Sequence, residues 1–315
     1  MKMRHALVAT AVALSLAVTA CGNDSGEEES DGGSGEATGG PLTLSGQNFT
    51  EMQIMAAMYG QLLTDAGYDV TTKLVATRDV YISQLESGEV DVVPEYLSGI
   101  ADQLNVLQNG ANAEPVTTND PQESLQALQP LADEAGITML EPAEATDQNA
   151  FAVTQDYAEE NDLTTLSDLG ALGEPITLAA APDCEGRPDC EAGLTGVYGI
   201  DIEEILPLGF GSPQTIDSVV SGESQLGLVA TTQADLEESG LVILEDDQGI
   251  QPAQNLIPAV NTDFLNDHPD VAEVLNELAA VLTTEDLADL NGRVSIDREK
   301  PEDVAADYLS EQGLT

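Results

Sequence analysis

Residues 42–96, LTLSGQNFTEMQIMAAMYGQLLTDAGYDVTTKLVATRDVYISQLESGEVDVVPEY, decide the fold class. Short apolar runs at 42–45, 70–75 and 90–93, the last ending at 94–96, indicate three strands. Apolar residues at helical spacing indicate helices at 51–65 and 78–87 between them, and Thr50 with Gln53 has the pattern of a capping box. Strands and helices that alternate at this spacing form a parallel sheet with helices on its faces. The chain is therefore predicted to be an α/β protein.

The rest of the chain continues the alternation of strands and helices. A helix at 122–135 and a strand at 137–140 are expected to close a first lobe, and the apolar stretch 150–153 is expected to cross into a second. The predicted elements of the second lobe are helices at 156–161, 190–198 and 213–220 and strands at 176–180, 205–208, 225–231 and 242–244. Residues 250–255 would form the return crossing, and helices at 271–282, 284–291 and 301–312 would pack against the first lobe.

One phrase occurs twice in the chain. LESGEVDVV at 85–93 has an echo in VVSGESQLGLV at 219–229, and each reads as a helix that ends in Ser-Gly-Glu and runs into an apolar strand. The echo favours two lobes of similar connectivity. Chance is the alternative, because a helix, a glycine and a strand often follow one another.

The N-terminus has the features of an exported lipoprotein. Lys2 and Arg4 precede an apolar run that is too short to span a membrane, so residues 1–20 are predicted to be a signal peptide. Residues 16–22, LAVTACG, resemble the bacterial lipobox, which predicts lipidation of Cys21 and anchoring to the outer face of the cytoplasmic membrane; a plain signal peptide is the alternative. Residues 21–41 contain mainly Gly, Ser and acidic residues and are predicted to be a flexible tether.

The charge balance is strongly acidic. All 58 acidic residues, but only six of the eight basic residues, follow position 21. Such a surface excludes nucleic acid and anionic lipid as partners of the folded protein. It also favours a habitat of high salt, where repulsion between like charges is screened.

The loop at 181–191, APDCEGRPDCE, brackets Arg187 between two cysteines. In an exported protein Cys184 and Cys190 are predicted to form a disulfide that makes the loop rigid. A rigidly held guanidinium matches a carboxylate, so Arg187 is a candidate anion-binding residue. The alternative is a surface arginine that offsets the acidic residues around it, Asp183, Glu185, Asp189 and Glu191.

The sequence lacks the residue patterns that are typical of enzyme active sites. After the signal peptide the chain has one histidine, His268, with no nucleophile motif beside it. No phosphate-binding loop of the Gly-Lys-Ser/Thr type and no His/Cys cluster with metal spacing occurs. We therefore expect a protein that is not an enzyme and needs neither cofactor nor metal.

Four segments together resemble a known family: SGQNFTE at 45–51, VDVVPEY at 90–96, RPD at 187–189 and LEDDQG at 244–249. They are similar to the substrate-binding proteins of ABC importers for osmoprotectants such as glycine betaine and choline, and the resemblance covers nearly all of 42–314. It implies a type II periplasmic-binding-protein fold, with two lobes joined by two hinge crossings that close on a ligand. The implied division is 42–147 for the first part of lobe I, 148–252 for lobe II and 253–315 for the return to lobe I.

In that family the trimethylammonium head of the ligand lies in a box of aromatic rings, and the ligand carboxylate meets an arginine. Arg187 matches the arginine and Tyr96 matches one ring. Three other box positions carry Asn149, Ala230 and Gln254, and Gln47 stands where many relatives have lysine. Phe151 and Phe210 are candidates for a shifted ring, although core packing is the alternative for both. The predicted ligand-binding residues are Gln47, Asn48, Thr50, Arg78, Tyr96, Ser98, Asn149, Arg187, Gln254 and Asn255.

The resemblance predicts a monomeric, extracytoplasmic protein that captures a small quaternary amine or zwitterionic osmolyte and delivers it to an ABC permease and its ATPase. Because the aromatic box is incomplete, a different polar or carboxylated solute is an alternative. A sensor lipoprotein of the same fold, without a transport role, is a third reading that the sequence leaves open.

Overall fold

The three strands expected between residues 42 and 96 lie side by side in the computed structural model, which describes residues 39–315. Strand β1 (Gly40–Gln47) pairs in parallel with β2 (Tyr68–Val75) and with β3 (Val92–Tyr96). Helices α1 (Thr50–Asp65) and α2 (Arg78–Ser87) connect them. The predicted parallel arrangement of these strands is confirmed.

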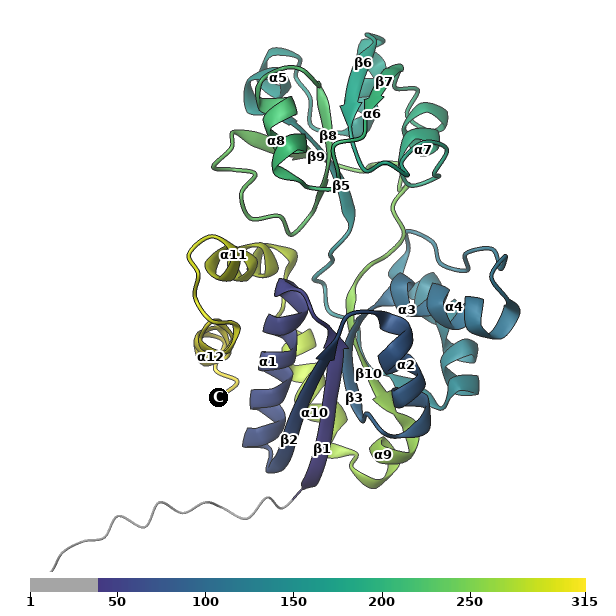
Figure 1. The fold of residues 1–315 in the computed structure, drawn as a ribbon, viewed down its shortest axis with the longest axis vertical. Coiled ribbons are helices and arrows are strands. Elements are labelled where there is room, and N and C mark those ends of the chain that lie inside the picture. The colour runs from purple at the N-terminus through teal and green to yellow at the C-terminus, as the bar shows by residue number, and fades with distance from the viewer. Residues whose placement is uncertain (1–38) are drawn as a thin grey trace, which may run out of the picture. The chain divides into compact units, whose positions relative to one another are not determined.

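Two further strands complete the first sheet, whose order is β2-β1-β3-β10-β4. Strand β10 (Leu256–Asn261) runs antiparallel to both β3 and β4 (Ile137–Met139), so a segment from late in the chain lies inside the sheet. The first lobe also contains α3 (Leu97–Asn109), α4 (Pro121–Ala135), α9 (Thr262–Asp267), α10 (Asp270–Ala279), α11 (Thr284–Ser295) and α12 (Pro301–Glu311). Helices α10, α11 and α12 contact α1, as predicted for the C-terminal helices (Figure 1).

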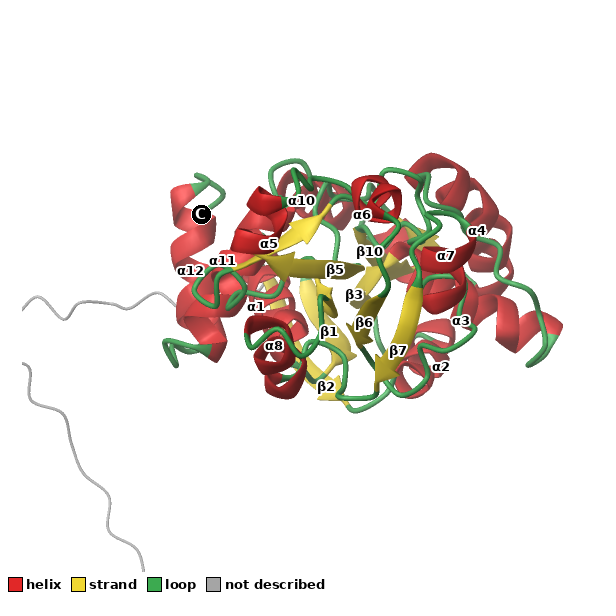
Figure 2. Cartoon of the chain, turned by 90° about the horizontal axis from the view of Figure 1, so that it is seen from above, coloured by secondary structure: helices red, strands yellow, loops and turns green. Residues whose placement is uncertain are grey.

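The second lobe is built on a sheet of order β7-β6-β8-β5-β9 (Figure 1). Its strands are β5 (Asn149–Thr154), β6 (Ile176–Ala179), β7 (Ile202–Leu206), β8 (Leu226–Ala230) and β9 (Leu241–Leu244). Its helices are α5 (Gln155–Glu160), α6 (Leu166–Leu172), α7 (Glu191–Gly196) and α8 (Pro213–Val220). Helices flank the strands of both lobes in the view from above (Figure 2).

The repeated phrase marks equivalent positions in the two sheets. Helix α2 ends at Gly88, with φ 74°, and leads to β3, while Gly222, with φ 77°, lies between α8 and β8. Strands β3 and β8 are each the central strand of their sheet, with a parallel neighbour on one side and an antiparallel neighbour on the other. The two lobes therefore share the connectivity that the echo indicated.

Several local predictions were wrong. The stretch 150–153 is not a crossing but lies within β5, which pairs with β8 and β9; its four residues are all buried, because both faces of this strand are covered. Thr50 does not cap α1: the N-cap is Phe49, and the side chain of Gln53 instead donates to Asn48 Oδ1 at 2.7 Å. Strand β7 begins three residues before its predicted start, since Ile202 pairs with Ile176.

Helix α3 was missed. Leu97, Ile100, Ala101 and Leu104 are all fully buried at the spacing of one helical face. That pattern is present in the sequence and predicts the helix once Tyr96 is recognised as the last residue of the strand.

The two lobes are connected by segments that bond to each other. The crossing between β4 and β5 meets the return between β9 and β10 in an antiparallel bridge of Thr146 with Asn255. Leu256 N donates to Ala145 O at 2.9 Å, and Asp147 N donates to Gln254 O at 3.3 Å. The first residue of α11 supports this ribbon, because Thr284 Oγ1 accepts from the backbone N–H of Thr146 at 2.9 Å.

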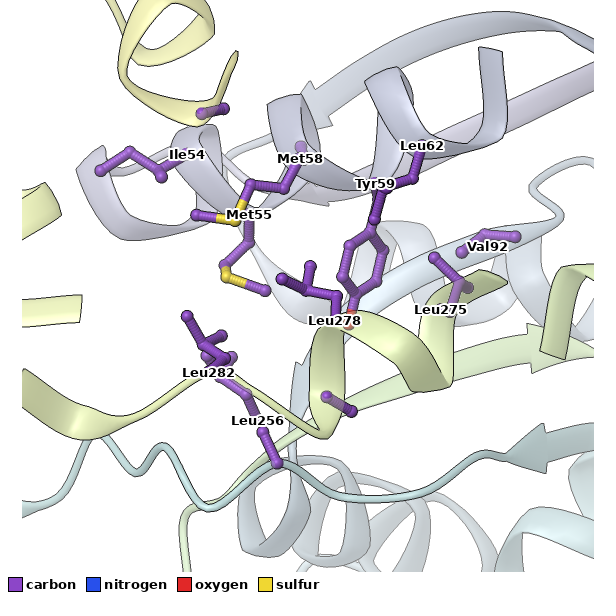
Figure 3. Close-up of a cluster of buried hydrophobic side chains, with 14 of the residues drawn as sticks. Ile54, Met55, Met58, Tyr59, Leu62, Val92, Leu256, Leu275, Leu278 and Leu282 are labelled. Carbon is purple, nitrogen blue, oxygen red and sulfur yellow. The ribbon is translucent and has the colours of Figure 1, made fainter. Parts of the chain in front are cut away.

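The core of the first lobe is centred on α1. Met55, Met58 and Tyr59 of α1 are buried, and Leu275 and Leu278 of α10 are buried in the same cluster (Figure 3). Burying this apolar face stabilises the lobe, because the removal of apolar surface from water drives folding.

The predicted signal peptide, the predicted lipidation site Cys21 and most of the predicted tether lie outside the described residues. Within residues 39–315, none of the helices has both the length and the apolar character needed to cross a bilayer.

Leu278→Ala tests the α1 core. Leu278 is 1 % exposed, so the variant is expected to lower the free energy of unfolding by about 2 to 5 kcal/mol. Urea denaturation measures this change. Leu107→Ala on α3, where the leucine is 53 % exposed, is the matched control and should change the free energy by less than about 0.5 kcal/mol. Equal effects of the two substitutions would contradict this description of the core.

Candidate functional site

The loop between β6 and α7 holds Arg187 on a rigid backbone. Cys184 and Cys190 form the predicted disulfide, with their Cα atoms 5.4 Å apart, and both cysteines are fully buried. The backbone of Arg187 lies inside this ring: its N–H donates to Cys184 O at 3.2 Å, and its carbonyl accepts from Cys190 N at 3.1 Å. The position of Arg187 is therefore fixed by covalent and backbone bonds.

The guanidinium of Arg187 bonds to two of the acidic residues of its own loop. Nε donates to Asp189 Oδ1 at 3.0 Å and Nη2 to Asp189 Oδ2 at 2.5 Å, while Nη1 donates to Asp183 Oδ2 at 3.3 Å. The hydrogen bonds that Arg187 donates to Asp189 raise the pKa of Arg187, so the guanidinium stays charged. Asp189 in turn accepts from Asn149 Nδ2 at 3.0 Å, which links this loop to the start of β5.

Arg187 lines a cavity of about 460 Å³ that elements of both lobes enclose. The other lining residues come from α3, from the segment before α4, from the cysteine loop and from the return crossing, and they are Asp102, Pro115, Thr117, Thr118, Asn119, Pro188, Asp189, Gly249, Ile250, Gln251 and Pro252. Asp102 Oδ1, Thr117 Oγ1 and Gln251 Oε1 are buried without a hydrogen-bond partner. Burial raises the pKa of Asp102. We call this space the Arg187 cavity.

Tyr96 lies at the end of β3 and is 7 % exposed. Its hydroxyl donates to Glu51 Oε1 at 2.5 Å. Burial and the adjacent carboxylate of Glu51 raise the pKa of Tyr96, so the phenol stays protonated. No pattern in the sequence singles out Glu51, because burial of an acidic residue in the first turn of α1 depends on distant parts of the chain.

A second, open cavity of about 640 Å³ lies beside Glu51 and is also lined by residues of both lobes. Its lining residues are Phe49, Thr50, Glu51, Asp147, Gly211, Pro213, Thr232, Gln233, Ala234, Asp235, Asn291, Ser295, Ile296 and Arg298. We call this space the Glu51 cavity. Phe49 and Asp147, which the sequence did not single out for a ligand, line it together with the predicted residue Thr50.

Arg78 lies in a buried ion pair. Its Nε donates to Glu95 Oε1 at 2.9 Å and its Nη2 to Glu95 Oε2 at 3.1 Å, and Tyr81 also donates to Glu95. Burial alone lowers the pKa of Arg78, but the charge of Glu95 outweighs it and raises the pKa. Because Glu95 is 1 % exposed, the pair satisfies a carboxylate that is closed off from solvent.

Three predicted residues bond to backbone at the junction of α3 and the crossings. Ser98 Oγ donates to Ala253 O at 2.6 Å, Asn255 Nδ2 donates to Ala143 O at 2.8 Å, and Gln254 Oε1 accepts from Gly99 N at 3.1 Å. Ser98 and Asn255 are buried, whereas Gln47 and Asn48 are less enclosed. The ligand-binding role of all ten predicted residues remains a prediction.

Two of the positions that the resemblance aligns with aromatic rings lie together in the structure. Asn149 and Ala230 face each other on the paired strands β5 and β8. Phe151 is 1 % exposed in the core of the second lobe, and Phe210 is 48 % exposed on the surface. Phe49 is the phenylalanine that lines the Glu51 cavity. Among residues 39–315 no three His, Cys, Asp or Glu side chains are grouped to hold a metal ion.

Comparison with known proteins identifies a family that the chain matches. Residues 40–311 match the family described as the substrate binding domain of ABC-type glycine betaine transport systems. The chain is 28% identical to a glycine-betaine-binding protein of Pseudomonas aeruginosa, over 87% of this chain and 88% of that protein. It is also 28% identical to the glycine betaine-binding protein YehZ of Escherichia coli, over 87% of this chain and 92% of YehZ. The solved structure of apo YehZ covers 87% of this chain, and 99% of its own length, with a TM-score of 0.75 and 27% identity.

Arg78→Ala tests the structural role of the buried ion pair. The variant leaves the Glu95 carboxylate buried without a charge partner, so a loss of about 3 to 5 kcal/mol in the free energy of unfolding is expected. Denaturant titration measures it, with the exposed Lys73→Ala as control. The double variant Arg78→Ala/Glu95→Gln should recover part of the loss; no recovery would mean that the two side chains do not act as a pair.

Proposed function

The chain belongs to the family of substrate-binding domains of ABC-type glycine betaine transport systems, and from this we propose that it captures a small quaternary amine or zwitterionic osmolyte, such as glycine betaine, and delivers it to a membrane permease. Proteins of this family bind solute outside the cytoplasm and act with the permease of an importer. The ligand would be held between the two lobes, which close around it.

The observation that carries the proposal is the guanidinium of Arg187 on a disulfide-bonded loop, beside a cavity that both lobes enclose. Asp189 holds one edge of the guanidinium through two hydrogen bonds and orients it. The contact of Nη1 with Asp183 is weak, because the side chain of Asp183 is 74% exposed and exposed ion pairs contribute little. A ligand carboxylate can replace Asp183 at low cost and would find the guanidinium already oriented.

A solute other than glycine betaine is the second candidate. It is favoured by Asn149 and Ala230, which face each other on β5 and β8 at positions where the family has aromatic rings. A polar side chain and a methyl group attract a quaternary ammonium less than two rings would. Calorimetry should therefore compare the affinities for carnitine, choline and ectoine with the affinity for glycine betaine.

The attachment of the protein to the membrane is proposed from the sequence alone. Cys21 follows LAVTA, and a lipid on its sulfur would hold the protein at the outer face of the cytoplasmic membrane. We also propose that the protein acts as a monomer with its permease.

Arg187→Ala tests the anion-binding role. Loss of a charged, two-pronged hydrogen-bond donor is expected to weaken glycine betaine binding by about 10- to 100-fold, as calorimetry would measure. Arg187→Lys keeps the positive charge but not the two-pronged donor geometry, so its affinity for glycine betaine should lie between those of the wild type and Arg187→Ala. The distant Lys300→Ala should bind glycine betaine with wild-type affinity. Unchanged affinity in Arg187→Ala would refute the assignment of this residue.

Small-angle scattering tests whether the lobes close on the ligand. Saturation with the solute that binds is expected to decrease the radius of gyration in small-angle scattering, because the two lobes approach each other. A radius that stays constant at saturation would be evidence against closure.

A further inference from the structure

Glu51 is a buried carboxylate whose two oxygens are both bonded. It is the second residue of α1 and is 3 % exposed. Oε1 accepts from the Tyr96 hydroxyl at 2.5 Å, and Oε2 accepts from Asn291 Nδ2 at 2.7 Å. The N-terminus of α1 favours its negative charge. Glu51 thereby fixes the ring of Tyr96, which the family resemblance places in the ligand site.

Asp147 brings a second carboxyl group to the same cavity. It lies in the first crossing, and its Oδ1 accepts from Thr232 Oγ1 of the second lobe at 3.0 Å. Burial and the charge of Glu51 raise the pKa of Asp147 to about 7. The ion pairs among the described residues involve Arg78, Arg187 and Arg293, and none of them includes Glu51 or Asp147.

Two further groups of the Glu51 cavity also suit a cation, although Arg298 lines the cavity as well. The ring of Phe49 is 39% exposed and lines it, and Asn291 Oδ1 is a buried acceptor without a hydrogen-bond partner. A cation over an aromatic face, near carboxylates and an amide oxygen, is attracted by each of these groups. Two buried like charges without a neutralising side chain are costly, and a positive ligand group lowers that cost.

We propose that Glu51 and Asp147, with Phe49 and Tyr96, recognise the positive group of the ligand in place of the aromatic rings that this chain lacks. The inference rests on the proposed function and extends it to the ammonium end of the solute. Glu51 acts as the positioning residue of Tyr96, and both carboxylates supply the attraction that a full ring box would otherwise provide.

The two proposed ends of the site are linked through the start of β5. Asp147 lines the Glu51 cavity, and Asn149, two residues later, bonds to Asp189, the partner of Arg187. Two residues of extended chain span about 7 Å. We therefore expect one osmolyte to reach both Asp147 and Arg187 only after the lobes close.

The direction in which ligand affinity changes with pH follows from the ionisation of Asp147. The groups around it are Glu51 of α1, Tyr96 of β3, Thr232 and Asp235 after β8, and Asn291 and Arg298 of the α11 region. With a pKa near 7, Asp147 is mainly protonated at pH 6 and mainly ionised at pH 8. Since a cationic ligand prefers the ionised form, affinity should rise with pH across this window.

The experiment compares glycine betaine with 3,3-dimethylbutanoate, which has the same shape and carboxylate but no positive charge. Calorimetry on the wild-type protein should show that glycine betaine binds more tightly than the isostere. Its affinity should rise by up to about tenfold from pH 6 to pH 8, because the ionised fraction of a group that titrates near 7 rises by that factor. The isostere without the positive charge should show neither a gain in affinity with pH nor an affinity comparable to that of glycine betaine.

Three variants separate the contributions. Asp147→Asn should abolish the pH dependence of glycine betaine affinity, and Glu51→Gln should weaken glycine betaine binding by tenfold or more. Each variant should also lower the ratio of the affinity for glycine betaine to that for 3,3-dimethylbutanoate. Tyr96→Phe keeps the ring but frees it from Glu51, so a smaller loss is expected. Thermal melting without ligand shows that each variant is folded, and Glu302→Gln, an exposed carboxylate in the first turn of α12, is the matched control.

The outcomes distinguish this inference from the function on which it rests. If both carboxylate variants keep the wild-type preference and pH profile while Arg187→Ala loses affinity, the inference is wrong and the proposed function stands. If the wild-type protein binds no osmolyte at either pH, the proposed function itself is wrong.

Discussion

The pairing of the two crossing segments is the constraint on which the arrangement of the lobes depends. The bridge of Thr146 with Asn255 and the backbone bonds on either side of it make the connection a two-stranded ribbon instead of two loose linkers. A ribbon of this kind can bend or twist while it keeps its register. The side chains of Asp147, at the end of the first crossing, and of Asn149, at the start of β5, are therefore directed toward fixed partners in the second lobe.

Scarcity of positive charge gives the few arginines defined roles. Among the described residues, Arg78, Arg187 and Arg293 each bond to carboxylates, but in different surroundings. Arg78 neutralises Glu95 inside the first lobe, Arg293 bonds to exposed acids near the C-terminus, and Arg187 lines a cavity between the lobes. In so acidic a protein, negative groups without a basic partner, such as Glu51 and Asp147, are then the natural partners of a cation.

Local patterns in the sequence predicted much of the fold. Helix α2 and helix α8 were predicted with their observed bounds, and the echo at 85–93 and 219–229 indicated the common connectivity of the two sheets. These features depend on neighbours along the chain, such as apolar spacing and a glycine after a helix. The stretch 150–153 was misinterpreted because four consecutive apolar residues do not reveal whether they cross between lobes or fill a sheet.

The sequence by itself determined the α/β class, the disulfide-bonded loop around Arg187 and the resemblance to a betaine-binding family, since each is written in residues that lie close together or in a recognisable order. Only the tertiary structure decided which polar residues bond to one another. Arg78 pairs with Glu95, and Tyr96 meets Glu51 and, through it, Asn291, 240 positions after Glu51. Burial and charge pairing depend on contacts between distant segments, and such contacts exist only once the chain has folded.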